Sequence, residues 1–486
     1  MDNPRQLKLA PLALACLCAA FVLVALCSQS SPLYPTNTWV DANCLLTVGR
    51  AMKSGSVLYR DIYEQKGPTL YLIHWAAACI SDSSFLGVFV LEAISLAAAL
   101  YAACRMMERR MNGWAAFCAA VLIGSLILTG GAFAQGDSAE EFCLPFLTGG
   151  LCLACRAYGR ENKAMPAKSL FACGLMAGVV ATIKYPVLGL FVGLCAVEGV
   201  LALREGGFLR ALRSAGVFLG GMLIPVAAWI VYFAAHGALA DFYTAYIHNN
   251  IFLYSDEART AVDILRDMAR TVRENLLWVA AACAGMLALL CDGREQAALK
   301  GGVLSMAACA FAAVFLLGRT FAYYPLVLGV FAFAGVPSLA GKLPVITERA
   351  RRIGVGASCA LALCCALLLS PNAPLRGVWR EDMAQTRLAA FVQPGATLLQ
   401  YSHLDDGLYL FTGTLPTQRY FCRLNVNDPV MAAELDRYLE EALVDYVLVS
   451  WEELPPRFDR YQWVATDAGY DDQNRINKYL HLYRRK

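Results

Sequence analysis

The sequence predicts an α-helical membrane protein with about eleven membrane-spanning helices and a small C-terminal α/β domain. Of its 486 residues, 58% are hydrophobic and only 16% are charged, whereas a soluble protein has about 25% charged residues. The mean hydropathy is +0.49. Apolar runs of about 17 to 22 residues recur from residue 9 to residue 370 and are long enough to cross a bilayer. Residues 371–486 are polar and lack such a run, so the transmembrane domain is predicted at 1–370 and the α/β domain at 371–486.

Basic residues predict how these spans are oriented in the plasma membrane. Lys and Arg gather in every second loop, and loops of this kind lie in the cytoplasm. The N-terminus is therefore expected in the cytoplasm and, because the number of spans is odd, the C-terminal domain outside it. The predicted spans are 9–27, 87–106, 113–130, 139–157, 168–183, 186–203, 214–235, 275–291, 300–317, 325–341 and 353–370. The basic segments contain Arg5 and Lys8; Arg105, Arg109 and Arg110; Arg156, Arg160, Lys163 and Lys168; Arg204, Arg210 and Arg213; Arg294 and Lys300; and Lys342, Arg349, Arg351 and Arg352.

Two apolar segments need a separate interpretation. Residues 67–80 are short, and counting them as a span would move the basic residues 105–110 to the outside. We therefore expect an amphipathic helix that lies along the outer surface or dips into it. Residues 1–27 have the basic start and apolar core of a signal peptide, but no small-x-small cleavage site stands out near Ser28. We therefore expect an uncleaved first span.

The C-terminal domain shows the patterns of both strands and helices. Alternating apolar and polar residues predict strands at 396–402 and 446–450. Residues 428–445 predict a helix, and Pro429 suits its first turn. The result is a small α/β domain with three or four strands.

The 19 cysteines indicate neither a disulfide framework nor a metal site. Most lie in the predicted spans, where Cys behaves as a small apolar residue. On the outer side, only Cys44, Cys79 and Cys422 lie outside the spans. Outside the predicted spans no CxxC pair or Cys/His metal spacing occurs, and the chain has no P-loop, GxGxxG, HExxH or nucleic-acid-binding motif.

The first outer loop, residues 28–86, is the most informative segment. It contains Asp41 in the sequence TWVDAN and, about twenty residues later, the charged and aromatic run YRDIYEQKGP at 59–68. A carboxylate at the boundary between water and lipid can act as a general base toward a hydroxyl. We expect that role for Asp41, and the alternative is a solvated loop residue or a helix N-cap.

A second acidic group, Asp137, Glu140 and Glu141, opens the span 139–157. Carboxylates are favourable at a helix N-terminus, so capping explains part of the pattern. Capping does not explain why Glu140 and Glu141 run directly into apolar residues at membrane depth. These two are candidate catalytic residues that either orient the acceptor or hold a divalent cation, and the sequence leaves both open.

Several cations are expected on the same side of the membrane as these carboxylates. Lys184 lies among apolar residues at the outward junction of two spans, where it either snorkels to the surface or provides a counter-charge for a phosphate. Lys66, Arg60 and Arg319 could act in the same way, and Tyr324 follows shortly after Arg319. Carboxylates and cations around a membrane-embedded cavity suit an acceptor hydroxyl and an anionic lipid phosphate.

The longest connection between spans, residues 236–274, is rich in Tyr, His and Asn. An amphipathic stretch at 261–273 follows. The segment could be an interfacial lid over the cavity or a plain surface loop, and the sequence leaves both open.

Taken together, Asp41, the segment GRAMKSG at 49–55, and the run at 59–68 resemble the first outer loop of the GT-C glycosyltransferases. The closest branch is the protein-mannosyltransferase and bacterial aminoarabinose-transferase-like group, glycosyltransferase family 39. The acidic second loop, the Lys184-Tyr-Pro turn and the final polar domain extend the resemblance over most of the chain. It implies a multi-span enzyme that uses a polyprenyl-phosphate sugar, with Asp41 as its catalytic residue.

The chain departs from this family where a second carboxylate is usual. Many relatives have Glu after the catalytic Asp, and its role would pass here to Asp61, Glu64 or Glu140. The departures are Ala42 for that Glu, Gly67 for a frequent Pro, and Tyr323 for a frequent His.

The expected function is transfer of a monosaccharide from a polyprenyl phosphate to an extracytoplasmic glycan, lipid or protein, with inversion. The donor phosphate is expected near Lys66, Lys184 or Arg319. A transporter or flippase for lipid-linked sugars remains an alternative, but transporters carry mid-span charges on broken helices in paired halves. A non-catalytic scaffold on the same framework is the third interpretation. The other residues expected to bind substrate are Arg60, Asp61, Glu64 and Tyr324.

Overall fold

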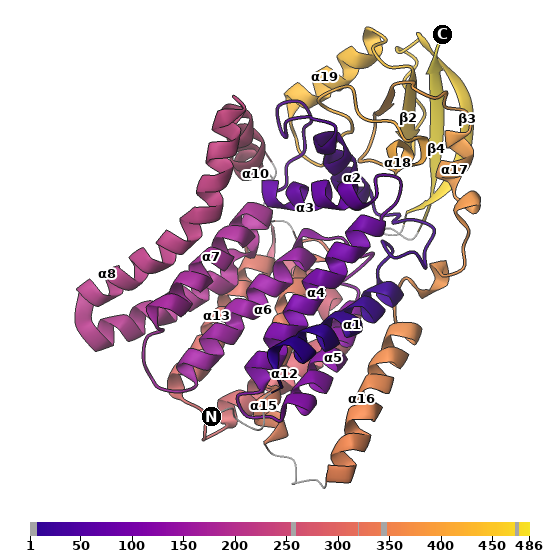
Figure 1. Ribbon diagram of the computed structural model, residues 1–486. Coiled ribbons are helices and arrows are strands. Elements are labelled where there is room, and N and C mark those ends of the chain that lie inside the picture. The colour runs from indigo at the N-terminus through magenta and orange to yellow at the C-terminus, as the bar shows by residue number, and fades with distance from the viewer. Residues whose placement is uncertain (1–6, 254–258, 319, 342–347, 472–475) are drawn as a thin grey trace. The chain divides into compact units, whose positions relative to one another are not determined.

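The computed structural model describes residues 7–253, 259–318, 320–341, 348–471 and 476–486 (Figure 1). They form two compact units, each assembled from three stretches of the chain. The helical unit contains residues 1–28, 92–229 and 257–374. The sheet unit contains residues 29–91, 230–256 and 375–486.

The helical unit confirms the predicted fold class, because each predicted span coincides with a helix or a series of short helical segments. Its elements are α1 (Leu9–Cys27), α4 (Leu86–Met107), α5 (Gly113–Leu128), α6 (Ala139–Tyr158), α7 (Ala167–Lys184), α8 (Gly189–Ala235), α11 (Ala261–Glu274), α12 (Leu276–Cys291), α13 (Ala297–Phe315), η3 (Tyr324–Val330), α14 (Phe331–Ala334), α15 (Val336–Ala340) and α16 (Glu348–Leu368), of which α4 and α8 extend into the sheet unit.

By length and apolar composition, four helical stretches of the described residues can cross a membrane. The number becomes five if α11 and α12, which are bent by 99°, count as one span. The remaining apolar helices are shorter, and one of the four stretches, Ala167–Ala235, contains three predicted spans. The presence of several such stretches indicates a multi-pass membrane protein. The predicted total of about eleven spans stays a prediction.

Element α8 consists of two helices joined at a kink. The sequence predicts separate spans at 186–203 and 214–235, joined by a basic loop. The structure has a helix for each of these spans, and the non-helical residues Gly206 and Gly207 join them. Gly207 has φ +68°, a left-handed conformation that L residues with a side chain rarely adopt. The two predicted spans are thus separate helices, and the connection between them is shorter than predicted.

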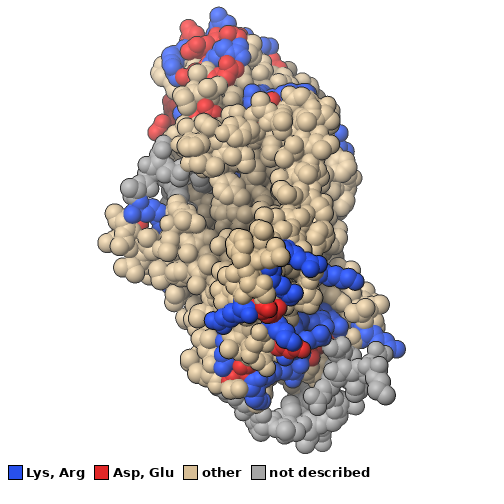
Figure 2. Space-filling model, turned by 90° about the vertical axis from the view of Figure 1, so that its left-hand side faces the viewer, with Lys and Arg blue, Asp and Glu red and all other residues tan. Residues whose placement is uncertain are grey.

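The basic loops meet at one end of the helical unit. Arg109, after α4, binds Glu295 at 2.7 Å, and the backbone N–H of Ala298 donates to Asn162 at 3.0 Å. The segments after α4, between α6 and α7, and between α12 and α13 therefore lie on the same side. Figure 2 shows this lower end rich in Lys and Arg and the surface next to it largely uncharged.

The opposite ends of the helices also converge. The side chain of Asn372 donates to the carbonyls of Cys27 at 2.6 Å and Ala134 at 2.9 Å. The N–H of Gly131 donates to the carbonyl of Glu274 at 2.9 Å. The ends of α1, α5, α11 and α16 thus meet, as alternating spans require. Which of the two sides faces the cytoplasm stays a prediction.

The lipid-facing character of the helical unit is visible in exposed apolar side chains. Leu14 and Phe21 on α1 are exposed, and so are Leu219 and Leu223 on α8. Large exposed apolar faces are unfavourable in water but suit the hydrocarbon of a bilayer. This pattern explains why the chain is so apolar without an equally large buried core.

The sheet unit combines the first loop with the C-terminal segment. Its sheet has the order β1-β2-β4-β3, with β1 parallel to β2 and the other neighbours antiparallel. Both predicted strands and the predicted helix at 428–445 are present. The elements are α2 (Val40–Lys53), α3 (Pro68–Ile80), α9 (Leu239–Phe242), a π-helix (Tyr243–His248), α10 (Asn249–Phe252), α17 (Ala384–Ala389), β1 (Leu398–Gln400), α18 (Leu408–Thr412), α19 (Pro429–Glu440), β2 (Tyr446–Ser450), β3 (Tyr461–Asp471) and β4 (Ile476–Arg485).

Helices α2 and α3 pack closely. A Cβ atom at Gly49 would lie 2.5 Å from the backbone carbon of His74, so only glycine permits this approach. Residues 68–80 form a helix, as predicted, and this helix packs against α2. Its position on a membrane surface stays a prediction.

Candidate functional site

Asp41 lies in the first turn of α2 and is 8% exposed. The Nζ of Lys66 donates to its Oδ1 at 2.6 Å and to Oε1 of Glu64 at 3.1 Å. Glu64 is 1% exposed, and its Oε2 accepts from the backbone N–H of Lys66 at 3.0 Å. Within the described residues, Oδ2 of Asp41 has no hydrogen-bond partner, so one carboxylate oxygen can accept a proton.

The cation of Lys66 is stabilised by this arrangement. Burial alone lowers the pKa of a lysine, but the charges of Asp41 and Glu64 outweigh it and raise the pKa of Lys66 well above its usual value. Lys66 therefore stays protonated across the physiological pH range. The structure thus brings together three of the predicted site residues.

The turn before Lys66 is held by Tyr59. This residue has φ 67°, which costs a non-glycine residue about 1–2 kcal/mol. Its ring packs against Phe233 and Phe242, and its hydroxyl donates to the carbonyl of Lys66 at 2.6 Å. Strain of this kind persists where the surroundings enforce it, as they do at functional sites. Tyr59 fixes the backbone from which the Lys66 side chain extends.

Arg60 and Asp61 take a different position. They bind each other at 2.8 Å with side chains that are 44% and 37% exposed. Arg60 also donates to the carbonyl of His236 at 2.8 Å, and Asp61 accepts from the N–H of Val57 at 2.8 Å. Their contacts stabilise the loop, and neither joins the cluster of Asp41 and Lys66.

The segment 236–253 packs on the same loop. Asn249 donates to the hydroxyl of Tyr63 at 2.7 Å, and Asn250 donates to the carbonyl of Gln65 at 2.7 Å. Both contacts fall within the run at 59–68. This part of the predicted lid or surface loop therefore packs on the run at 59–68, and no sequence pattern indicates these contacts of Asn249 and Asn250.

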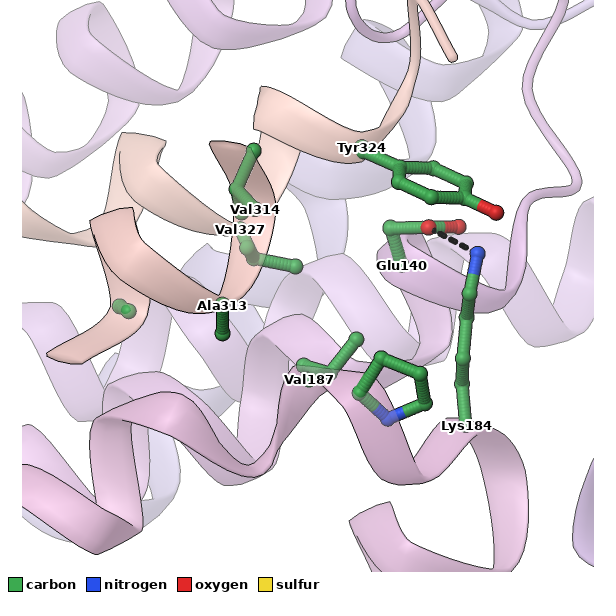
Figure 3. A pocket seen from close by; sticks show the side chains of 9 residues that line it. Glu140, Lys184, Val187, Ala313, Val314, Tyr324 and Val327 are labelled. Carbon is green, nitrogen blue, oxygen red and sulfur yellow. Dashed lines mark hydrogen bonds and ion pairs between the residues drawn. The ribbon is translucent and has the colours of Figure 1, made fainter. Parts of the chain in front are cut away.

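A second cluster lies within the helical unit, where α6 begins and α7 ends (Figure 3). The Nζ of Lys184 donates to Oε1 of Glu140 at 2.5 Å. It also lies 3.6 Å from the centre of the Tyr324 ring, a cation–π contact. The other oxygen of Glu140 is buried and has no partner among the described residues. Three further predicted residues are thus brought together.

This second cluster lines a cavity of about 20 Å³, which is room for about one water molecule. Figure 3 shows Glu140, Lys184 and Tyr324 along one part of the wall and apolar side chains along the rest. A charged pair beside apolar walls suits a ligand with an anionic head and a hydrocarbon tail. The apolar lining residues are Pro186, Val187, Ala310, Ala313, Val314 and Val327.

Glu141 belongs to a third group, at the start of α6. Its N–H donates to the Ser138 hydroxyl at 3.1 Å, a helix N-cap. The N–H of Asp137 donates to both Glu141 at 2.9 Å and Glu92 at 2.8 Å, and Glu92 also accepts from Ser28 at 2.9 Å. Sequence reasoning missed Glu92, although a lone carboxylate inside an apolar span is a signal for a buried polar contact.

Helix α2 is also fixed from the C-terminal segment. The hydroxyl of Thr47 donates to Oδ2 of Asp405 at 2.7 Å, and Arg50 donates to the carbonyl of Tyr409 at 3.1 Å. Burial raises the pKa of Asp405 to about 6, although the Thr47 hydroxyl and the N–H of Gly407 oppose this effect. The helix that carries Asp41 is therefore held by residues more than 350 positions away in the sequence.

Two further expectations from the sequence concern Arg319 and a divalent cation. Arg319 lies outside the described residues. Across the described ranges, no three His, Cys, Asp or Glu residues are arranged to hold a metal ion.

Comparison with known proteins identifies the fold. No protein-family model matches the chain, and no curated protein matches its sequence. ArnT from Cupriavidus metallidurans bound to undecaprenyl phosphate matches with a TM-score of 0.61, over 97% of each chain at 14% identity. ArnT in the apo state matches with a TM-score of 0.62, again over 97% of each chain at 14% identity. The chain has the GT-C fold.

The GT-C fold confirms the resemblance drawn from the first outer loop. Because the match covers 97% of the chain, it includes residues of both units and is not confined to the apolar helices. At 14% identity the likeness concerns the fold, so the chemical roles of Asp41, Lys66 and Lys184 rest on their own contacts.

Proposed function

We propose that the protein is a glycosyltransferase that moves a monosaccharide from a polyprenyl phosphate to a hydroxyl acceptor on the extracytoplasmic side. The observation that carries this proposal is the buried Asp41, which is paired with Lys66 and keeps a second oxygen without a partner among the described residues, in a chain with the GT-C fold. ArnT was solved with undecaprenyl phosphate, which supports a polyprenyl phosphate as the class of ligand.

In the proposed reaction, Asp41 removes the proton of the acceptor hydroxyl. The acceptor oxygen forms a bond to the anomeric carbon while the bond from that carbon to the phosphate oxygen breaks, so the sugar inverts. Polyprenyl phosphate leaves with the bonding electrons. Lys66 holds Oδ1 of Asp41 and leaves Oδ2 for the proton. Glu64 keeps Lys66 in place.

For the leaving phosphate we propose Lys184 as the main cation. Its ammonium group lies against Tyr324 in a cavity with apolar walls, and Glu140 is its carboxylate partner. A phosphate would compete with Glu140 for this ammonium group. Fixed cations that meet a developing anion in a site of low dielectric contribute strongly to catalysis. Lys66 and Arg319 are the alternative cations.

The remaining assignments follow from this reaction. We propose a multi-pass protein of the plasma membrane with a cytoplasmic N-terminus and an extracytoplasmic C-terminal segment, which helps to recognise the acceptor. A divalent cation at Glu140 or Glu141 remains a proposal to be tested by chelation, because the carboxylate of Glu140 already has Lys184 as a partner and that of Glu141 already accepts from the N–H of Asp137.

The decisive experiment measures sugar transfer by the purified protein in liposomes with a panel of polyprenyl-phosphate sugars. Wild type is compared with Asp41→Asn and with the control Asp82→Asn, whose exposed carboxylate pairs with Lys53. We expect Asp41→Asn to lose about 10²–10⁴-fold in turnover, the usual contribution of a general base, and Asp82→Asn to keep wild-type turnover. A parallel series with EDTA tests the divalent cation.

Full turnover in Asp41→Asn would show that this residue is not the base. A wild type that transfers no sugar but moves the lipid-linked sugar across the bilayer would identify a transporter instead.

A further inference from the structure

The cysteines are unevenly divided between the two units. Only Cys44, Cys79 and Cys422 belong to the sheet unit, and all the others belong to the helical unit. Cys44 lies on α2, one turn after Asp41. Cys422 lies in the C-terminal segment between α18 and α19.

These two distant cysteines meet inside the sheet unit. Their Sγ atoms are 3.6 Å apart although the residues are separated by 378 positions in the sequence. Cys44 is 0% exposed and Cys422 is 1% exposed. The N–H of Asp405 donates to Sγ of Cys44 at 3.3 Å, which keeps that sulfur oriented within the contact. Cys79, by contrast, is exposed.

We propose that Cys44 and Cys422 form a disulfide bond in the mature protein. This inference rests on the proposed function in one respect, since that function puts the sheet unit outside the cytoplasm, where thiols are oxidised. A disulfide needs an Sγ–Sγ distance of about 2 Å, so the two sulfurs have to approach by about 1.5 Å for the bond to form.

The bond forms by thiol–disulfide exchange with an extracytoplasmic protein disulfide. The thiolate of one cysteine attacks that disulfide and gives a mixed disulfide, which the thiolate of the second cysteine then resolves. The oxidant leaves as a dithiol, which takes up the two electrons and, by way of solvent, the two protons of the thiols. Burial raises the pKa of both Cys44 and Cys422, so few thiolates exist in the closed unit. Exchange therefore takes place while the two segments are docking.

The disulfide would have a consequence for the site. Cys44, Thr47 and Arg50 follow one another at intervals of three residues along α2, and each of them contacts the C-terminal segment. The contacts of Cys44 and Thr47 are each made by a single side-chain atom, so each of these non-covalent contacts can break. A covalent bond at Cys44 keeps the helix that carries Asp41 on the C-terminal segment.

The first test is direct detection of the bond in the full-length wild-type protein. Cells are treated with an alkylating agent before lysis, and the purified protein is digested without reduction and analysed by mass spectrometry. We expect one cross-linked pair of peptides, containing Cys44 and Cys422, that separates on reduction, while Cys79 is recovered alkylated. Recovery of Cys44 and Cys422 as alkylated thiols would overturn the proposal.

A second measurement compares thermal unfolding in detergent with and without reductant. We expect reductant to lower the unfolding midpoint of the wild type and of Cys79→Ser, and to leave Cys44→Ser and Cys422→Ser unchanged. An equal response of all four proteins would contradict the bond. Sugar transfer is measured on the same preparations. If the protein transfers sugar but yields no cross-linked peptides, only the proposed disulfide is contradicted. If it yields the cross-linked peptides but transfers no sugar, only the proposed function is contradicted.

Discussion

Lys66 bonds to two buried carboxylates, and this explains how charged side chains persist in the loop next to the first span. Removing one member of a buried ion pair typically costs about 3–5 kcal/mol, because the remaining charge is left uncompensated. Asp41, Glu64 and Lys66 are each 19% exposed or less at the side chain. The cluster is therefore held as one group, and its geometry depends on all three members.

Asp405 provides a prediction for pH dependence. Its pKa rises from an ordinary 3.8 to about 6 because the carboxyl group is buried. Between these values the folded protein holds a proton that the unfolded chain has lost, so the free energy of unfolding falls as the pH rises. The stabilisation of the folded state by protonated Asp405 is fully present below about pH 4 and is lost as the pH rises through about 6. We expect a loss of roughly 1–2 kcal/mol between about pH 5 and 7.5.

The measurement is thermal unfolding in detergent as a function of pH, for wild type and Asp405→Asn. The variant cannot ionise, so the difference between the two proteins should grow in favour of the variant as the pH rises. Asp382→Asn, at an exposed position, should follow the wild type. Parallel pH profiles for wild type and Asp405→Asn would exclude Asp405 as the titrating group.

The sequence suggested the candidate residues better than it suggested their partners. Asp41, Lys66, Glu140, Lys184 and Tyr324 were proposed from residue type and position near the outward span ends, and Glu64 from the resemblance to the GT-C glycosyltransferases. Ion pairing between Lys66 and Asp41 or between Lys184 and Glu140 was not, because it depends on side chains from separate elements. Glu92 was missed for the same reason, since its partners Ser28 and Asp137 lie far away in the sequence.

At the scale of elements, the first turn of α6 directs two adjacent carboxylates to different partners. Consecutive residues of a helix are rotated by about 100°. The carboxylate of Glu141 therefore accepts from the backbone N–H of Asp137, just before its own helix, whereas the carboxylate of Glu140 accepts from Lys184 at the end of α7. This division explains why a capping interpretation of the pair is half correct.

This geometry predicts opposite effects for the two partners. Lys184→Met should weaken the binding of polyprenyl phosphate about 10- to 100-fold, as expected for the loss of a charged hydrogen bond. Glu140→Gln should tighten the same binding, because it removes the carboxylate that competes with the phosphate. The measurement is equilibrium binding of polyprenyl phosphate to the protein in lipid nanodiscs.

Lys168→Met serves as the matched control, because Lys168 lies near the other end of α7 and is exposed. If Lys184→Met bound polyprenyl phosphate as wild type does, the phosphate would lie at Lys66 or Arg319 instead. If Glu140→Gln weakened binding, Glu140 would orient the ligand and not compete with it.

Sequence patterns predicted most elements because their periods are local. The apolar runs located the helices, and alternation located β1 and β2. The break between the two helices of α8 was predicted, but its short length at Gly206 and Gly207 was not, because a backbone φ leaves little trace in hydropathy. Strands β3 and β4 escaped prediction, since they pair as a long hairpin whose alternation is weak.

At the scale of the whole molecule, the sheet unit is assembled from three stretches of the chain. We therefore predict that removing one stretch disrupts the unit. A chain that ends at Pro374 removes Asp405 and Tyr409, the partners of Thr47 and Arg50 on α2. We expect such a chain to insert into membranes but to transfer no sugar and to be cleaved by protease within residues 29–91. Wild-type turnover and protease resistance in the truncated protein would contradict this dependence.

The three-stretch assembly also determines when the site can form. Residues 29–91 leave the ribosome early, but the last of the three stretches of their unit begins only at residue 375 and extends to 486. At a synthesis rate of about 5–20 residues per second, the helix that carries Asp41 waits roughly 20 to 80 s for its partners. During that time the helical unit can enter the membrane first. On the proposed function, we therefore expect no sugar transfer during synthesis, until residues 375–486 have docked in the sheet unit.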